Sequence, residues 1–256
     1  MQTNYILSTK DLKFYRKYGY LVIKNFFLKK DIPKIINWVG DIEKFKNVKG
    51  KWMKYYDPSI KNKKKQILTR VENFYDYHKK FKNFFSKKII LDQFAKLAGG
   101  KVCLFKDKIN FKYPGSKGFE PHQDATIWKN MYGIRNFLTI VVSVDKSDIK
   151  NGCLEIAEGN NIKRLLGKEW KKIPKKIEKK LKWRKIETKP GDIIIFHDYT
   201  PHKSANNFSY KKRRMIFLTY NKLIYGDHRI KHFKDKRKNF PPNFEREKGK
   251  KYTFHI

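Results

Sequence analysis

The sequence is poor in cysteine, in acidic residues and in long apolar runs, and each shortage excludes a class of protein. Only Cys103 and Cys153 occur among 256 residues, too few for a disulfide framework or a four-cysteine zinc site, as expected in a reducing compartment. No segment approaches the ~18 consecutive apolar residues of a membrane span, and the N-terminus lacks the apolar run of a signal peptide. We therefore expect a cytoplasmic protein that does not use a membrane.

The shortage of acidic residues leaves a formal net charge of +38, because 62 Lys and Arg face only 24 Asp and Glu. Such a surface attracts nucleic-acid phosphates and small anions alike. The lysines are spread over the whole length and form no basic arm, so composition explains most of the charge. A nucleic-acid-binding or nucleic-acid-modifying protein stays open as an alternative, which steep salt-dependent binding would favour.

Apolar residues are nevertheless sufficient for one core, since 39% of the chain is apolar and 16% is aromatic. The length fits a single domain over residues 1–256. Residues 1–100 are expected to be mostly helical support. The elements predicted there are helices that begin after Ser8 and at Ile32, a strand at 20–27, a lysine-rich connection up to Leu68 and a helix over 71–98.

After residue 100 the hydrophobic pattern changes to that of short strands with turns between them. Residues 101–222 therefore predict a mainly β core, a sandwich or barrel, interrupted by a helical insert over 161–183. Residues 223–256 are expected to form an irregular basic extension. The predicted strands are 101–113, 136–145, 152–158, 185–190, 192–197 and 213–222.

The stretch PHQDATIW places His122 and Asp124 two positions apart, after a loop with two glycines. Positions i and i+2 of a strand face the same side, so this imidazole and carboxylate can point at one metal ion. Two histidines and one carboxylate on one face of iron(II) leave three coordination positions open. The second histidine must come from elsewhere, and His202 fits better than His197, which is expected to pack nearby.

Arg213 and Arg214 open a predicted strand, where neighbouring side chains face opposite sides. One arginine therefore faces inward. A guanidinium is a planar fork that matches a carboxylate, so the inward arginine suits a dicarboxylate cosubstrate shaped like 2-oxoglutarate.

The segments PHQDATIW, NGCLEIAEGNN, GDIIIFHDYTPHKSANN and RRMIFLTY, in this order, resemble the phytanoyl-CoA dioxygenase family of iron(II)- and 2-oxoglutarate-dependent oxygenases. The resemblance covers residues 10–222 and implies a double-stranded β-helix, a jelly-roll barrel with flanking helices. It implies that His122, Asp124 and His202 hold iron(II). It also implies that Arg213 binds 2-oxoglutarate, with Arg214 as its outward neighbour or as the alternative if the register slips by one, and that O2 is the oxidant.

The resemblance implies further contacts as well. Lys112 and Thr139 lie where family members add contacts to the cosubstrate, and Trp128 and Tyr132 are candidates to line the substrate pocket. Ala157 departs from the family's proline-glycine-serine-histidine run, which puts a substrate contact from that loop in doubt.

The expected reaction is hydroxylation of an unactivated C–H bond in a small metabolite, and the basic charge favours an anionic one. Some bacterial members of the family hydroxylate aminoalkyl phosphonates at the carbon next to phosphorus, and KINFKYPG with PHQDA is similar to these members. A barrel that keeps the motif without catalysis is a further alternative. Succinate release lost on His122→Ala or Asp124→Ala would distinguish the enzyme from both alternatives. The oligomeric state is left open.

Overall fold

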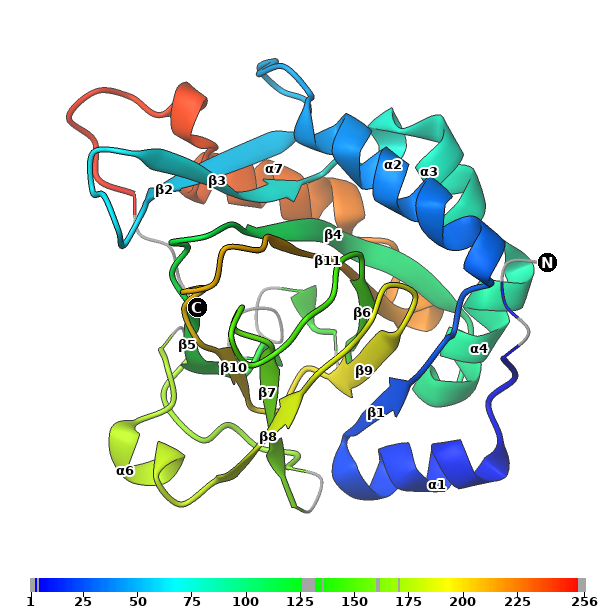
Figure 1. Cartoon of the computed structure of the whole chain (residues 1–256). Coiled ribbons are helices and arrows are strands. Elements are labelled where there is room, and N and C mark those ends of the chain that lie inside the picture. Colours follow the sequence, from blue (N-terminus) through cyan, green and yellow to red (C-terminus); the bar gives the residue numbers. More distant parts are fainter. Residues whose placement is uncertain are drawn as a thin grey trace.

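Two antiparallel sheets form the centre of the molecule (Figure 1). The computed structural model describes residues 3, 5–125, 132–134, 136–159, 162–169 and 171–252. The larger sheet contains, in spatial order, β1 (Tyr20–Ile23), β9 (Ile193–His197), β6 (Leu138–Ser143), β11 (Arg213–Lys222), β4 (Val102–Lys112), β3 (Gln66–Glu72) and β2 (Met53–Pro58). The smaller sheet contains β5 (Phe119–His122), β10 (His202–Ser204), β7 (Leu154–Glu158) and β8 (Lys182–Ile186). The predicted jelly-roll fold is confirmed.

The space between the sheets is filled by side chains from alternate strand positions. On β11, Met215 and Phe217 point inward, while Ile216 and Leu218 point to the opposite face. β-Branched and aromatic residues favour such strands, because they pack well on a pleated surface. The residues of this inner cluster are Tyr20, Val141, Leu154, Ile156, Ile186, Ile194, Phe196, Met215 and Phe217.

Four helices cover the outer face of the larger sheet: α1 (Thr9–Tyr18), α2 (Ile32–Glu43), α3 (Lys79–Phe85) and α4 (Lys88–Ala98). Ser8 and Asp11 form a capping box at the start of α1, and the helix ends at Gly19 with φ of 77°. The predicted starts of α1 and α2 are therefore confirmed. The described residues also contain four short 3₁₀ turns: η1 (Lys29–Asp31), η2 (Tyr75–Tyr77), η3 (Leu223–Tyr225) and η4 (Asn243–Glu245).

The first hundred residues are less helical than predicted. β2 and β3 form a hairpin at the edge of the larger sheet, where a lysine-rich connection and the start of a helix were expected. The helix predicted over 71–98 is divided into η2, α3 and α4. The lysines of this segment are in the turn between the two strands, at 61 and 63–65, and they dominate its composition. The short alternation of the flanking strands was therefore missed.

The insert at 161–183 is also less helical than predicted. Within its described residues it holds one short helix, α6 (Lys175–Glu178), and strand β8 begins at Lys182. Pro174 disfavours helical geometry in the residue before it, and α6 buries none of its side chains. Without an apolar stripe against the core, a longer helix would lack the packing that stabilises most helices.

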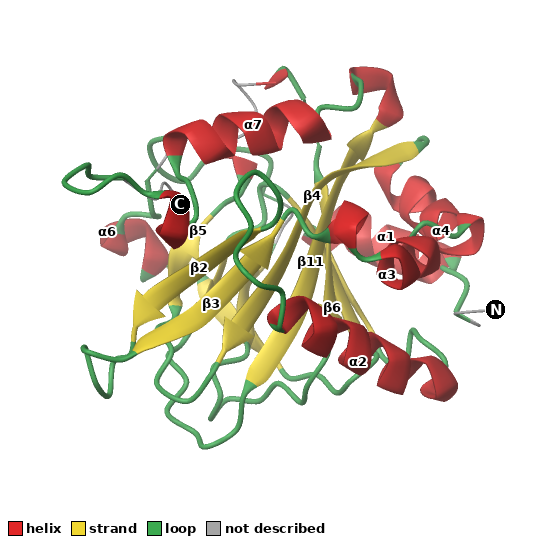
Figure 2. Cartoon of the chain, turned by 90° about the horizontal axis from the view of Figure 1, so that it is seen from above, coloured by secondary structure: helices red, strands yellow, loops and turns green. Residues whose placement is uncertain are grey.

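The C-terminal extension was predicted to be irregular but contains helix α7 (Arg229–Asn239). In Figure 2, α7 and α2 lie on opposite sides of the larger sheet. The buried residues of α7 are Arg229, His232 and Phe233, while Ile230 is 87% exposed. The helix was missed because charged residues, rather than an apolar stripe, attach it to the sheet.

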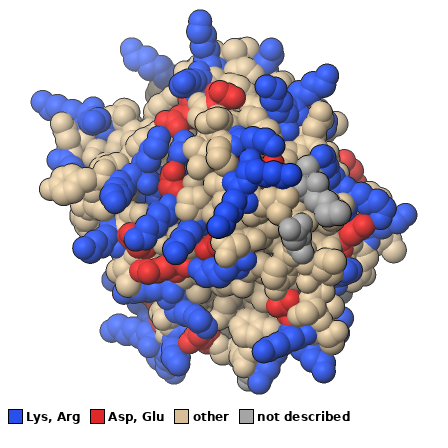
Figure 3. Space-filling view, turned by 45° about the vertical axis from the view of Figure 1, so that its right-hand side comes forward, with Lys and Arg blue, Asp and Glu red and all other residues tan. Residues whose placement is uncertain are grey.

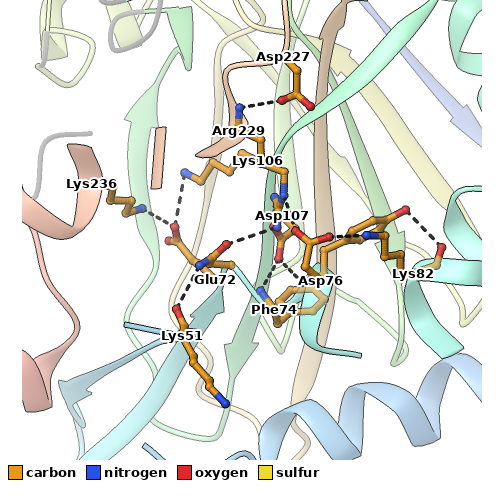
Figure 4. Close-up of polar contacts among 12 residues, drawn as sticks. Lys51, Glu72, Phe74, Asp76, Lys82, Lys106, Asp107, Asp227, Arg229 and Lys236 are labelled. Atoms are coloured by element: carbon orange, nitrogen blue, oxygen red, sulfur yellow. Dashed lines mark hydrogen bonds and ion pairs between the residues drawn. The ribbon is translucent and has the colours of Figure 1, made fainter. Parts of the chain in front are cut away.

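Arg229 is the main ionic anchor of α7 (Figure 4). Its guanidinium pairs with the fully buried carboxylate of Asp107 and, at 3.2 Å, with Asp76. Asp107 also accepts hydrogen bonds from the backbone N–H groups of Phe74, at 2.7 Å, and Tyr75, at 3.0 Å. One carboxylate thus joins β4, η2 and the start of α7.

Arg229→Met is expected to lower the free energy of unfolding by about 3–5 kcal/mol, because it leaves the Asp107 carboxylate buried without a countercharge. Urea denaturation followed by circular dichroism measures this loss. Lys82→Met is the matched control, because Lys82 pairs with Asp76 at the half-exposed surface of the same cluster. Loss of the Lys82–Asp76 ion pair should lower the free energy of unfolding by at most about 1 kcal/mol. Equal losses in the two variants would contradict the assignment of Arg229 as the anchor.

Lys and Arg side chains are spread over the face in Figure 3, with Asp and Glu among them. Within the described residues, none of the helices has the length and apolar character needed to cross a bilayer.

Candidate metal centre

Two neighbouring strands of the smaller sheet bring the predicted histidines together. His122 ends β5 and His202 begins β10, and the two lie directly opposite each other in the antiparallel register. Their ring centroids are 4.2 Å apart. Asp124 follows two residues after His122, and the nearest ligand atoms of the three side chains all lie within 4.8 Å of one another.

Backbone carbonyls orient both imidazole rings. Nδ1 of His122 lies 2.7 Å from the carbonyl oxygen of Glu120, and Nδ1 of His202 lies 3.0 Å from that of Thr200. A carbonyl can only accept, so each Nδ1 carries the proton and each Nε2 keeps a free lone pair. A histidine ligand typically binds its metal with one ring nitrogen while the other donates to such a partner.

The charge states also suit a metal ion. Burial, and then the neighbouring His202, lower the pKa of His122 to about 3, and burial lowers the pKa of His202 as well. Burial opposes ionisation of Asp124, but His202, His122 and Lys108 outweigh it and hold the pKa of this carboxyl below its usual value. Two neutral imidazoles and one carboxylate are the donor set of the non-haem iron(II) facial triad, so the three side chains fit that ion.

The two arginines at the start of β11 have different environments. Arg214 points outward and binds both carboxylate oxygens of Asp145 at 2.9 Å, with Glu43 at 3.5 Å. Arg213 points inward and is 3% exposed, and its buried Nε has no hydrogen-bond partner. Burial lowers the pKa of Arg213 to about 10, and no acidic side chain within the described ranges pairs with it. Arg213 is thus an inward guanidinium that can accept a carboxylate.

Lys112 lies opposite Arg213 on the adjacent strand β4. Its Nζ is buried and lies 2.8 Å from Ser204 Oγ, 2.5 Å from the carbonyl oxygen of Ala205 and 3.3 Å from that of Gly152. Gly152 has φ of 72°, and a Cβ there would lie 2.3 Å from the Ala205 oxygen, so only glycine fits. Lys112, Ser204 and Arg213 form a polar cluster at one end of the space between the sheets.

Other predicted residues lie elsewhere. Thr139 is buried and hydrogen-bonds Thr219 at 3.1 Å, six positions or roughly 20 Å along β11 from Arg213. Tyr132 packs on Phe105 and donates to Asp235 of α7 at 3.1 Å. The cosubstrate role of Thr139 and the substrate role of Tyr132 remain predictions.

Two further predictions concern Trp128 and His197. Trp128, a candidate to line the substrate pocket, lies outside the described residues. His197 accepts a hydrogen bond from the N–H of Tyr199 at 3.0 Å, and its ring centroid lies 6.4 Å from that of Tyr15. His197 is the last residue of β9 and packs against Tyr15 of α1.

The sequence analysis did not single out Ser204 and Lys108. Both could have been found from the period of two along a strand. Ser204 lies two positions after His202, and Lys108 lies four positions before Lys112, so each shares an inward face with a residue that had been identified.

A cavity of about 570 Å³ is lined by residues of β2, β3, β4 and β5. Arg70 of β3 and Asn110 and Lys112 of β4 line one side, and Phe119 of β5 lines another. It thus borders the strand that carries His122, and basic residues contribute to its wall.

Comparisons with known proteins show the family and the fold of this chain. The family model described as phytanoyl-CoA dioxygenase matches residues 15–215. The chain is 42% identical over 236 residues to 2-aminoethylphosphonate dioxygenase of the uncultured bacterium HF130_AEPn_1, covering 92% of this chain and 89% of that protein. It is 30% identical to methylphosphonate hydroxylase of Gimesia maris, covering 93% and 89%. The crystal structure of EctD from S. alaskensis with 2-oxoglutarate and 5-hydroxyectoine has the same fold, with a TM-score of 0.73, 16% identity and coverage of 86% and 77%.

Proposed function

Because the chain belongs to the phytanoyl-CoA dioxygenase family, and is thus an iron(II)- and 2-oxoglutarate-dependent oxygenase, we propose that it hydroxylates 2-aminoethylphosphonate at the carbon bonded to phosphorus. The observation that carries the substrate is the 42% identity, over nearly the whole chain, to a protein named for that compound. Methylphosphonate hydroxylase as a second relative supports the phosphonate class. The excess of basic side chains favours a substrate of negative charge.

In the proposed reaction one oxygen atom of O2 enters the C–H bond and the other enters succinate, while 2-oxoglutarate loses carbon dioxide. Bound iron(II) supplies the activation of O2. The Nε2 atoms of His122 and His202 and the carboxylate of Asp124 would hold that ion, a role supported by their mutual distances and by the Nδ1 contacts.

Arg213 would bind the far carboxylate of 2-oxoglutarate, with Lys112 and Ser204 beside it. Burial without an acidic partner supports this role, since an isolated buried guanidinium is costly until an anion compensates it. Bidentate binding would also fix the orientation of the cosubstrate.

Apolar side chains keep the site dry. The ring of Phe196 lies 4.6 Å from the ring of His202, and Met215 and Phe217 follow Arg213 along the inner face of β11. Exclusion of water strengthens the electrostatic contacts of the bound anions and protects reactive intermediates from side reactions.

The substrate is tested by incubation with iron(II), 2-oxoglutarate and O2, with phosphorus NMR of the product and a parallel assay of succinate. We expect succinate and a hydroxylated phosphonate in equal amounts from 2-aminoethylphosphonate. Acyl-CoA thioesters and free amino acids are the comparison substrates. Coupled turnover of one of these, without turnover of the phosphonate, would refute the proposal.

Lys112 should make the binding of 2-oxoglutarate pH-dependent. Burial and the adjacent Arg213 lower the pKa of Lys112 to about 6, so its amine is mostly neutral at pH 8, and a bound carboxylate restores the proton. Affinity should therefore fall with increasing pH above 6, by up to about tenfold per unit, with uptake of a proton on binding. Calorimetry in buffers of different ionisation enthalpy measures the uptake. If the affinity of Lys112→Met for 2-oxoglutarate fell with pH as steeply as that of the wild type, Lys112 would not be the group that takes up the proton.

A further inference from the structure

Lys108 lies on the same inner face of β4 as Lys112, four positions or roughly 13 Å away. Its cross-strand neighbours are Phe217 on β11 and Glu72 on β3. Lys112 is beside Arg213, at the end where the cosubstrate is proposed to bind. Lys108 therefore lies farther along the space between the sheets, away from the end at which 2-oxoglutarate is proposed to bind.

The ammonium of Lys108 lies among aromatic rings. Nζ is 4.6 Å from the centroid of Phe217 and 6.0 Å from that of Phe119. In the part of the chain that the structure describes, it makes no hydrogen bond and no ion pair. Aromatic faces attract a cation but provide no lone pair for its N–H groups. Lys108 is half-buried, and none of the oxygen atoms of the described residues accepts a hydrogen bond from its ammonium to compensate the desolvation.

The nearest acid across the strand is already engaged (Figure 4). Glu72 is fully buried, and its Oε2 binds Lys236 of α7 and lies 3.9 Å from Lys106. Arg70 lies 3.9 Å from the other carboxylate oxygen. Three cations thus surround one carboxylate, and Lys108 adds a further positive charge to the same face.

Asp124 is the acid on the other side of Lys108. Lys108 Nζ lies 6.0 Å from the ring centroid of Phe119, on strand β5, which ends at His122 two residues before Asp124. Asp124 is assigned to the metal, whose charge would outweigh that of the carboxylate. Even without an ion, the described charged groups on this face are net positive, because Arg70, Lys106 and Lys236 outnumber the carboxylates of Glu72 and Asp124.

We propose that Lys108 is an anion subsite that binds the phosphonate group of the substrate and thereby selects tetrahedral oxyanions over carboxylates. The inference rests on the proposed function. Phosphonate oxygens would supply the acceptors that the Lys108 ammonium lacks. Because Lys108 adjoins the triad, the carbon bonded to phosphorus would lie beside the metal, in agreement with the proposed position of hydroxylation.

The test compares wild type with Lys108→Met and Lys108→Arg. Loss of a charge-assisted hydrogen bond should raise the KM for 2-aminoethylphosphonate by about 10- to 100-fold, with the KM for 2-oxoglutarate unchanged. Lys108→Arg should recover most of the loss. Lys61→Met is the matched control, because Lys61 also lies over an aromatic ring, Tyr210 at 5.3 Å, but at the surface. It should leave both constants unchanged.

A binding assay without turnover separates the subsite from the reaction. Calorimetry under anaerobic conditions, with iron(II) and 2-oxoglutarate present, would titrate methylphosphonate and 3-aminopropanoate. Wild type should prefer methylphosphonate, and Lys108→Met should lose that preference. If both binding results are obtained but the wild type turns over no phosphonate, the Lys108 subsite is supported and the proposed function is refuted.

If the wild type turned over 2-aminoethylphosphonate and Lys108→Met bound it with unchanged affinity, the subsite would be refuted while the proposed function would be supported. A parallel rise in the KM for 2-oxoglutarate would also overturn it, because Lys108 would then serve the cosubstrate. If Lys108→Met does not fold, Lys108→Gln provides the neutral variant for both assays.

Discussion

Asp124→Ala is expected to abolish both iron(II) binding and succinate formation. The substitution leaves two neutral imidazoles and removes the only anionic donor among the three clustered side chains. Since metal-assisted activation is worth several kcal/mol of barrier, kcat/KM should fall by about 10³-fold or more. Succinate release with 2-aminoethylphosphonate measures the activity. Thermal unfolding with and without iron(II) measures binding, because a ligand that binds the folded state raises its stability.

Glu178→Gln is the control for this experiment. Glu178 is half-buried near the same sheet and pairs with Lys203 at 2.9 Å, next to His202 in sequence. It should keep full activity and the iron(II)-dependent rise in unfolding temperature. If Asp124→Ala retained that rise and its turnover, the metal would be held by other residues and the assignment of the triad would be wrong.

Arg213→Met is expected to raise the KM for 2-oxoglutarate by about 10²- to 10³-fold, because breaking a buried charge pair by removing one partner costs roughly 3–5 kcal/mol. The free protein should lose little stability, since Arg213 has no acidic partner within the described residues and its burial is costly. Steady-state kinetics with varied 2-oxoglutarate and urea denaturation measure the two effects separately.

Arg214→Met provides the matched comparison, with the opposite pattern expected. Arg214 binds Asp145 through two hydrogen bonds and also contacts Glu43, so its loss should destabilise the protein and leave the KM for 2-oxoglutarate nearly unchanged. A larger effect on KM from Arg214 than from Arg213 would mean that the roles of the two residues are reversed.

Much of the site follows from short-range rules. The spacing of His122 and Asp124 places both side chains on one face, and neighbouring positions on a strand require one of the two arginines to face inward. The order of four segments was sufficient to indicate the family, which the match over residues 15–215 confirms. The two histidines were named from sequence, and their register on β5 and β10 accounts for their proximity.

The prediction of secondary structure from the sequence was wrong where an element is attached to the core by charged residues that are distant in sequence, and not by a periodic apolar face. The hairpin of β2 and β3 was assigned to a connection and the start of a helix, because its two strands are short and a lysine-rich turn separates them. Helix α7 was assigned to an irregular tail, because it has no apolar stripe along its own length. Arg229 and Asp107 attach α7 to β4 although they are far apart in sequence. No local pattern encodes such a pair, since its stability depends on burial that exists only after the sheets form.

The sequence by itself determined the reaction class and the fold class, and it predicted the metal ligands, since residue identity, spacing and order encode these. Only the tertiary structure shows that, among the residues it describes, Arg213 rather than Arg214 has no acidic partner and Lys108 has no hydrogen-bond acceptor. Both findings depend on desolvation. A charged side chain can bind a ligand of opposite charge when folding removes its water and the protein supplies no partner for it. Which side chains are placed in this way depends on the packing of strands that are far apart in the sequence.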